Sequence, residues 1–144
     1  MSEAERLDFI LDAWALLAHF GNEPGAERVR QVLKSAEKHE CTTGMSMINL
    51  GEVAYILERE RGLEQVHKAL AVIRSLPIRL LQVDEKVVLA AAHIKANHRL
   101  SYADAFAAAS AKLWQAKLLT GVPELKALEG SGFTIEWLPD VDGK

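Results

Sequence analysis

The sequence has few of the features that mark secreted, zinc-binding and membrane proteins. Its 144 residues contain one cysteine, Cys41, which excludes an intramolecular disulfide and a cysteine-rich zinc site. The apolar runs 13–18 and 87–92 are too short for a signal-peptide core or a membrane span. The net charge of −3 gives no global basic signature, so any contact with nucleic acid must be local. We expect a cytoplasmic protein without a membrane partner.

The chain also lacks internal repeats, low-complexity tracts and a recognisable linker. Hydrophobic residues make up 49% of it and charged residues 26%, as in ordinary globular proteins. A chain of this length can bury a sizeable core. We therefore expect a single domain, 1–144, with its core at about 8–138.

Segments with the character of strands alternate with segments of helical periodicity. The expected strands are 9–11, 42–48, 78–83, 117–120 and 133–138. The expected helices are 13–20, 26–40, 49–61, 63–75, 85–98, 101–115 and 123–128. This alternation favours a parallel sheet covered on both faces. The predicted fold is α/β: a three-layer α/β/α domain with a short, mainly parallel central sheet of about five strands.

Asp104 is the only charged residue between positions 102 and 111, and its neighbours are mostly alanine. An acid in such a packed helix must be exposed, paired, hydrogen-bonded or bound to a cation. Ser101-Tyr102-Ala103-Asp104 fits a capping box, with Ser101 as the N-cap. A capping role and a functional role are both open for Asp104.

Two further acids lie where strands are expected to lead into helices. Asp12 directly follows the first strand, and Glu52 lies in the expected first turn after the second, where Asn49-Leu50-Gly51-Glu52 has the spacing of a capping box. Each acid, like Asp104, has a capping explanation of its own. Three carboxylates in apolar settings at one sheet edge would nevertheless repel one another unless a cation lay between them. Such an oxygen-only set suits Mg²⁺ or Mn²⁺.

Four short motifs follow one another along the chain: Leu11-Asp12-Ala13-Trp14-Ala15-Leu16-Leu17, Ile48-Asn49-Leu50-Gly51-Glu52-Val53, Leu100-Ser101-Tyr102-Ala103-Asp104-Ala105 and Thr120-Gly121. No single motif is specific. In this order, and on an α/β layout, they resemble the PIN-domain ribonuclease family, in particular the VapC-type toxins of bacterial toxin–antitoxin pairs. The resemblance covers about residues 8–138.

The resemblance implies a metal-dependent endoribonuclease that hydrolyses RNA phosphodiester bonds. It implies Asp12 and Asp104 as the main ligands of Mg²⁺ (or Mn²⁺), with Glu52 completing the catalytic cluster as a ligand or by orienting the attacking water. Thr120 matches a hydroxyl residue that supports the site. The implied partners are an RNA substrate and a cognate antitoxin protein, whose arginine often enters the acidic site, with assembly as a homodimer or a toxin–antitoxin hetero-oligomer.

Val122 departs from the family, which usually has an acid at this position. It is also a poor N-cap for a helix beginning at Pro123, where aspartate would be a good one. The chain works with three carboxylates, or Glu124 substitutes, or activity is impaired. Glu124 lies two residues on, and a helix would direct its side chain elsewhere.

The remaining candidates have competing explanations. Lys95, His98 and Arg99 would either meet phosphates or complete a helix end. His93 and His98 are five residues apart, too far out of phase to share a helical face as zinc ligands, and no histidine is expected to be catalytic. Trp14 would either stack on a base or pack in the core or an interface.

Three functions therefore stay open. The first is the nuclease toxin. The second is a catalytically weakened PIN-like module that binds RNA or a partner, an alternative that Val122 sustains. The third is an unrelated α/β protein whose acids only cap helices.

Overall fold

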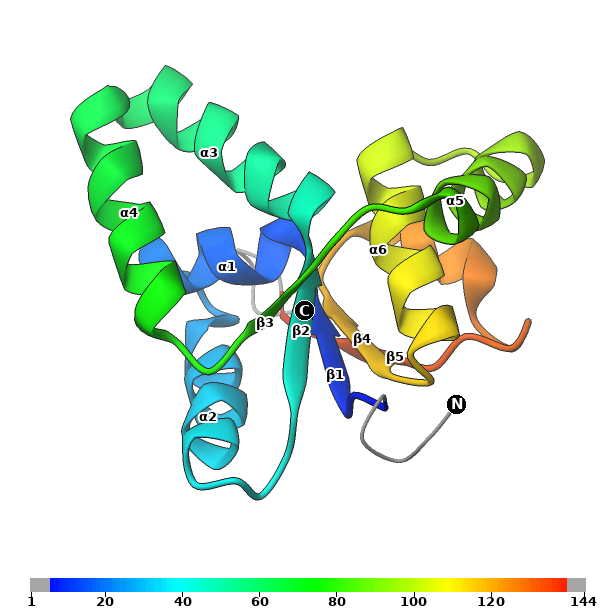
Figure 1. Cartoon of the computed structure of the whole chain (residues 1–144), viewed down its shortest axis with the longest axis horizontal. Coiled ribbons are helices and arrows are strands. Elements are labelled where there is room, and N and C mark those ends of the chain that lie inside the picture. The colour runs from blue at the N-terminus through cyan, green and yellow to red at the C-terminus, as the bar shows by residue number, and fades with distance from the viewer. Residues whose placement is uncertain (1–5, 140–144) are drawn as a thin grey trace.

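A five-stranded sheet lies at the centre of the molecule, with helices on both of its faces (Figure 1). The computed structural model describes residues 6–139, so the outermost residues of the expected domain, 1–5 and 140–144, lie outside the described residues. The strand order is β3-β2-β1-β4-β5, and all four strand pairs are parallel. The predicted α/β fold with about five mainly parallel strands is confirmed.

The elements follow the predicted alternation. The strands are β1 (Phe9–Leu11), β2 (Thr43–Ser46), β3 (Arg79–Leu81), β4 (Lys117–Thr120) and β5 (Ile135–Trp137). The α-helices are α1 (Ala13–Phe20), α2 (Ala26–Glu37), α3 (Met47–Arg61), α4 (Leu63–Ser75), α5 (Glu85–Asn97) and α6 (Tyr102–Leu113), and η2 (Pro123–Leu128) is a 3₁₀ helix. Five of the twelve predicted segments match these bounds, six are shortened by one to three residues at an end, and the helix predicted at 49–61 begins two residues earlier.

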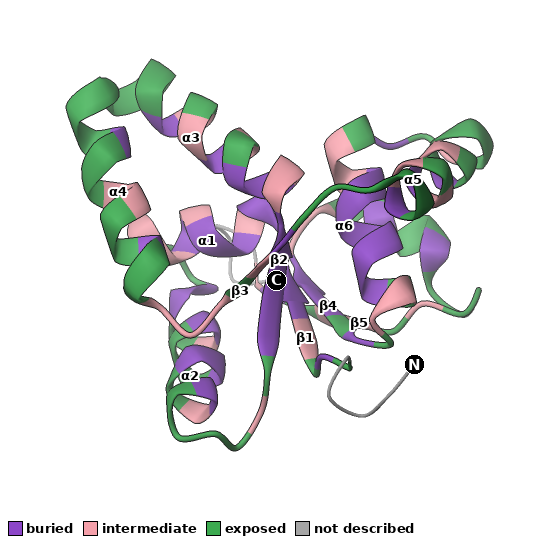
Figure 2. Ribbon diagram, viewed as in Figure 1, coloured by how far each residue is buried: buried purple, intermediate pink, exposed green. Residues whose placement is uncertain are grey.

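Two apolar cores are separated by the sheet, because successive residues of a strand point to opposite faces. Ile10 and Leu118 pack with α5, α6 and η2, whereas Leu11 and Leu119 pack with α1 to α4. Figure 2 shows the resulting buried centre, with the far ends of α3 and α4 largely exposed. The inner strands are thus buried on both faces, and their polar side chains lie mainly at the strand ends.

The boundary between β2 and α3 differs from the prediction. The expected strand 42–48 ends at Ser46, and the helix begins at Met47, because the Ser46 hydroxyl accepts a hydrogen bond from the amide of Ile48. The predicted capping box at Asn49–Glu52 is therefore wrong. Asn49 lies inside the first turn of α3, and Glu52 lies in the turn after it.

The predicted caps at Asp12 and Ser101 are confirmed, and Asp84 caps a helix in the same way. The carboxylates of Asp12 and Asp84 accept hydrogen bonds from the amides of Ala15 and Val87, at 2.9 and 3.0 Å, and so cap α1 and α5. Ser101 caps α6 by accepting from the amide of Asp104 at 3.0 Å. These caps fix the directions in which α1 and α6 leave the sheet edge.

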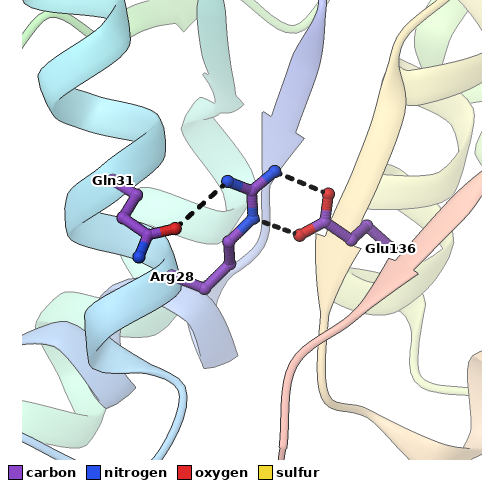
Figure 3. A network of polar contacts seen from close by, with 3 residues as sticks. All are labelled: Arg28, Gln31 and Glu136. Atoms are coloured by element: carbon purple, nitrogen blue, oxygen red, sulfur yellow. Dashed lines mark hydrogen bonds and ion pairs between the residues drawn. The ribbon is translucent and has the colours of Figure 1, made fainter.

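The edge strand β5 is held to α2 by a two-pronged ion pair (Figure 3). The Nε and Nη2 atoms of Arg28 donate to the two carboxylate oxygens of Glu136 at 2.6 and 3.0 Å, and Nη1 donates to Gln31 at 3.5 Å. Burial of Glu136 opposes its charge, but the Arg28 hydrogen bond outweighs this and lowers its pKa. This pair fixes the outer strand beside β4.

Among residues 6–139, no helix combines the length and apolar character needed to cross a bilayer.

Candidate acidic site at the carboxyl edge of the sheet

Asp12 is the most deeply buried acid of this edge, with 1% of its surface exposed. It directly follows β1 and caps α1, so its Oδ1 atom accepts from the amide of Ala15 at 2.9 Å. Its Oδ2 atom accepts a short hydrogen bond from the hydroxyl of Thr120. Both oxygens are therefore held in place by β1, α1 and β4.

Thr120 ends β4, which pairs directly with β1. Its buried hydroxyl donates to Asp12 and accepts from the amide of Val122 at 3.0 Å. The backbone turn at Val122 is thus tied to the position of the Asp12 carboxylate. The Val122 side chain packs on the core under α6, and it offers η2 no side-chain cap.

Glu52 reaches the site from α3 and is partly buried. The amide nitrogen of Asn49 donates to its Oε1 atom at 3.3 Å and to the carbonyl of Ala103 at 3.1 Å. Ala103 precedes Asp104 in α6. A single buried amide thus connects the helix that carries Glu52 to the helix that carries Asp104.

Asp104 lies in the first turn of α6, as predicted, and is partly buried. Burial raises its pKa, hydrogen bonding from Ser101 lowers it, and the nearby charge of Glu124 raises it. Glu124 is exposed on η2. Its charge acts on Asp104, so Glu124 lies within electrostatic range of that carboxylate.

The three predicted acids lie within electrostatic range of one another. Burial, together with the charges of Asp104 and Glu52, raises the pKa of Asp12 to about 7 against the opposing hydrogen bonds of Thr120 and Ala15. Burial and the charge of Asp104 also raise the pKa of Glu52, although the Asn49 hydrogen bond lowers it. All three acids therefore resist ionisation, and each would be relieved by a positive charge between them.

The donor set suits a hard divalent cation. It consists of oxygen atoms alone, and the buried Oδ1 atom of Asn49 accepts no hydrogen bond from any described residue. Within residues 6–139, however, no three Asp, Glu, His or Cys side chains are close enough to hold one ion as they stand. The chemistry of the residues fits a cation, and closing on one would require the half-exposed acids to move inward.

Trp14 packs rather than protruding at this edge. A Cβ atom placed on Gly121 would lie 2.6 Å from its ring, so glycine is required there for the ring to lie against the turn after β4. The base-stacking alternative for Trp14 finds no support in this packing.

The basic candidates Lys95 and Arg99 are exposed near the end of α5, and the His98 ring bonds the carbonyl of Ile94 at 3.0 Å. This arrangement matches the helix-end alternative.

Asn49 is the site residue that sequence reasoning missed. It was interpreted as an N-cap, yet it is fully buried and bonds both Glu52 and α6. The available signal was Ser46, a good N-cap three residues earlier, which would have placed Asn49 inside the helix and facing the core.

The PIN domain family model matches residues 9–128. The chain belongs to the PIN domain family. No curated protein sequence is detectably similar to it.

Solved structures share the fold of this PIN domain over nearly their whole length. VapBC2 from Rickettsia felis, bound to a DNA fragment from its promoter, matches with a TM-score of 0.73 and 17% identity over 92% of this chain and 99% of that chain. DNA-bound VapBC from Salmonella typhimurium matches with a TM-score of 0.71 and 21% identity over 90% and 97%. VapC20 from Mycobacterium tuberculosis, described as a toxin that cleaves the sarcin-ricin loop, matches with a TM-score of 0.67 and 19% identity over 85% and 95%.

Proposed function

We propose that this PIN domain is a metal-dependent endoribonuclease that hydrolyses RNA phosphodiester bonds, and that it is the toxin of a toxin–antitoxin pair. The observation that carries the proposal is the convergence of Asp12, Glu52 and Asp104, whose pKa values are all raised by burial. Clustered acids with perturbed pKa values are typical of functional sites. A shared fold with a toxin described as cleaving RNA of the sarcin-ricin loop agrees with this function.

In the proposed site, Mg²⁺ or Mn²⁺ would be held by Asp12 and Asp104, with Glu52 as a further ligand or as the group that orients the attacking water. Such an ion supplies positive charge that stabilises the charge developing on phosphate oxygens. Asp12 is already oriented by Thr120 and Ala15, so it needs little reorganisation to bind.

The protonation state of Asp12 also supports a cation at the acidic edge. With a pKa of about 7, Asp12 carries a proton part of the time at neutral pH. A cation at the edge favours the ionised form, so its binding would release protons. Without a cation, the ionised acids repel RNA phosphates, which means that RNA would approach this edge only when the metal is present.

A cleavage assay tests the function. Wild type, Asp104→Asn and the control Asp84→Asn are incubated with a pooled RNA and Mg²⁺, with EDTA in a parallel set. Asp84 lies at the start of α5, outside the acidic edge, and caps that helix through its carboxylate, so its substitution makes the same exchange of acid for amide near a helix N-terminus elsewhere. We expect Asp104→Asn to lower the cleavage rate by about 100-fold, the upper end of what groups around a metal contribute, and Asp84→Asn to leave it unchanged. Equal rates for Asp104→Asn and wild type would contradict the proposal.

A second candidate is a catalytically weakened module that binds RNA or a partner. Two observations favour it: Val122 occupies the position of a usual acid, and no three candidate ligands among the described residues close on one ion. Mn²⁺-dependent binding of RNA without cleavage by wild type would select this alternative.

The partner proposal follows from the same edge. Carboxylates in a partly buried cluster attract an arginine strongly, which suits an antitoxin that inserts one. Structures with this fold include VapBC complexes. We propose a cognate antitoxin as the partner of this chain, with a homodimer or a hetero-oligomer as the assembly and the single domain 1–144 as its unit.

A further inference from the structure

Asn49 is a fully enclosed polar residue of the acidic edge, with 0% of its surface exposed. A buried amide that only stabilised the fold would be expected to satisfy all of its hydrogen-bonding capacity within the protein. Asn49 does not, because its Oδ1 atom accepts from no described residue while its nitrogen makes two hydrogen bonds.

The orientation of this amide is determined by its partners. Both acceptors of the nitrogen, the Glu52 carboxylate and the Ala103 carbonyl, lack hydrogens to donate. Exchanging the amide oxygen and nitrogen would place an oxygen against two acceptors. Asn49 is therefore fixed in the orientation that holds Glu52.

We infer that Asn49 is a positioning residue of the proposed nuclease. It orients the Glu52 carboxylate and ties α3 to the first turn of α6, so that Glu52 and Asp104 keep a fixed relation to each other. Its free Oδ1 atom provides an oxygen acceptor beside them for a water molecule of the site. This inference rests on the proposed function, and it adds a residue that acts through Glu52 without itself being a metal ligand.

A double-mutant cycle tests the inference. The variants are Asn49→Ala, Glu52→Ala and the pair together, with Asn97→Ala as the control. Asn97 also donates from its amide to a helix carbonyl, that of His93 at 2.9 Å, but on the exposed surface of α5. Each variant is assayed for kcat and KM on RNA with Mg²⁺, for Mn²⁺ affinity by calorimetry, and for its melting temperature.

We expect Asn49→Ala to lower kcat by about 10- to 100-fold and Mn²⁺ affinity by about 10-fold, as loss of an outer partner of a metal ligand does, with KM little changed. In the Glu52→Ala background the same substitution should change kcat by less than about twofold, because the two residues act as a unit. Asn97→Ala should leave kcat and Mn²⁺ affinity as in wild type.

Three outcomes overturn the inference. Asn49→Ala with wild-type kcat and Mn²⁺ affinity shows that the residue positions nothing, although the nuclease proposal then stands. Equal fold losses in the presence and absence of Glu52 show that Asn49 does not act through Glu52. Wild type that neither cleaves RNA nor binds Mn²⁺ overturns the nuclease proposal together with the inference. If Asn49→Ala does not fold, Asn49→Asp takes its place in the double-mutant cycle. Aspartate keeps the shape of the side chain and, when ionised, has no hydrogen to donate.

Discussion

Among the described residues, partly or fully buried carboxylates lie in two places: Glu136 is in β5, and three further acids form the acidic edge. The two places differ in whether a cationic side chain lies beside the acid. Glu136 is met by the guanidinium of Arg28, which lowers its pKa despite burial. Asp12, Glu52 and Asp104 face one another instead, and their pKa values are raised. The comparison shows that a buried acid here is stable as an anion where a cation is built in, and that the acidic edge lacks this cation among its own residues.

The largest effect expected from this difference is on the pH dependence of stability. The folded chain keeps the Asp12 proton up to about pH 7, whereas its ordinary pKa is 3.8. The unfolded chain therefore binds fewer protons between these values, and the free energy of unfolding falls as pH rises through them, by on the order of 4 kcal/mol. Urea unfolding in EDTA across this range measures the loss.

Asp12→Asn is the matched variant for that measurement, because it removes the titrating group and keeps the shape. It should flatten most of the fall, leaving the smaller slope of Glu52 and Asp104. Glu136 acts in the opposite direction, at the acid end of this range: its lowered pKa gives stability that is lost as pH falls below its ordinary value of 4.5, so Glu136→Gln should steepen the net fall there and leave it unchanged nearer pH 7. An unchanged slope in Asp12→Asn would refute the assignment.

Binding of a divalent cation at the acidic edge should counteract this loss in the free energy of unfolding. At pH 7, Mn²⁺ at 100 times its dissociation constant stabilises a protein that binds it only when folded by about 2.7 kcal/mol. We expect the melting temperature to rise with Mn²⁺ in wild type and to stay constant in Asp12→Asn and Asp104→Asn. Stabilisation of equal size in all three proteins would place the cation elsewhere.

A fourth carboxylate at the acidic edge should enlarge the difference between that edge and Glu136. Val122→Asp puts an acid at the position where Val122 fails to cap η2. In EDTA the added repulsion should lower the melting temperature, whereas with Mg²⁺ the RNA cleavage rate should rise roughly 10-fold, as expected for one more group around a metal. Val72→Asp, on an exposed position of α4, adds the same charge as a control. Cleavage no faster than wild type, at matched metal and folding stability, would refute the role of this position.

The smallest expected effect concerns Glu136, which already lies beside a cationic side chain. Arg28→Met removes the guanidinium from Glu136, and the side chains are 41% and 24% exposed, so solvent screens much of the loss. We expect a decrease in the free energy of unfolding of about 1 kcal/mol, measured by urea unfolding. Lys68→Met breaks the more exposed pair with Glu64, whose side chains are 65% and 84% exposed, and should cost only about 0.3 kcal/mol. A larger loss for Lys68→Met would invert the comparison.

The sequence was most informative where local chemistry decides the structure. The caps at Asp12 and Ser101 could be predicted because the capping side chain bonds an amide only three residues away. The alternation of strand and helix likewise predicted the parallel sheet, since short buried strands between helices have few other arrangements.

The remaining features depend on contacts that sequence patterns do not encode. Arg28 and Glu136 are 108 residues apart, and nothing in their local sequence pairs them. Asn49 was misplaced because Met47 and Ile48 suit a strand as well as a helix, so the boundary moved past Ser46. The direction of the Glu124 side chain was inferred from ideal α-helical geometry, whereas η2 is a 3₁₀ helix with a different angular step, so that inference remains a prediction.

The hydrogen bond between Thr120 and Asp12 also spans 108 residues, and this separation sets when the acidic edge can exist. Asp12 directly follows β1, the first of the described strands to be synthesised, and β4, which carries Thr120, is made only after α1 to α6. Because β1 lies between β2 and β4, the carboxylate lacks its hydroxyl partner until β4 has been added beside it. A growing chain would therefore have no assembled site until β4 has been synthesised, and the proposed nuclease activity would begin only after that point.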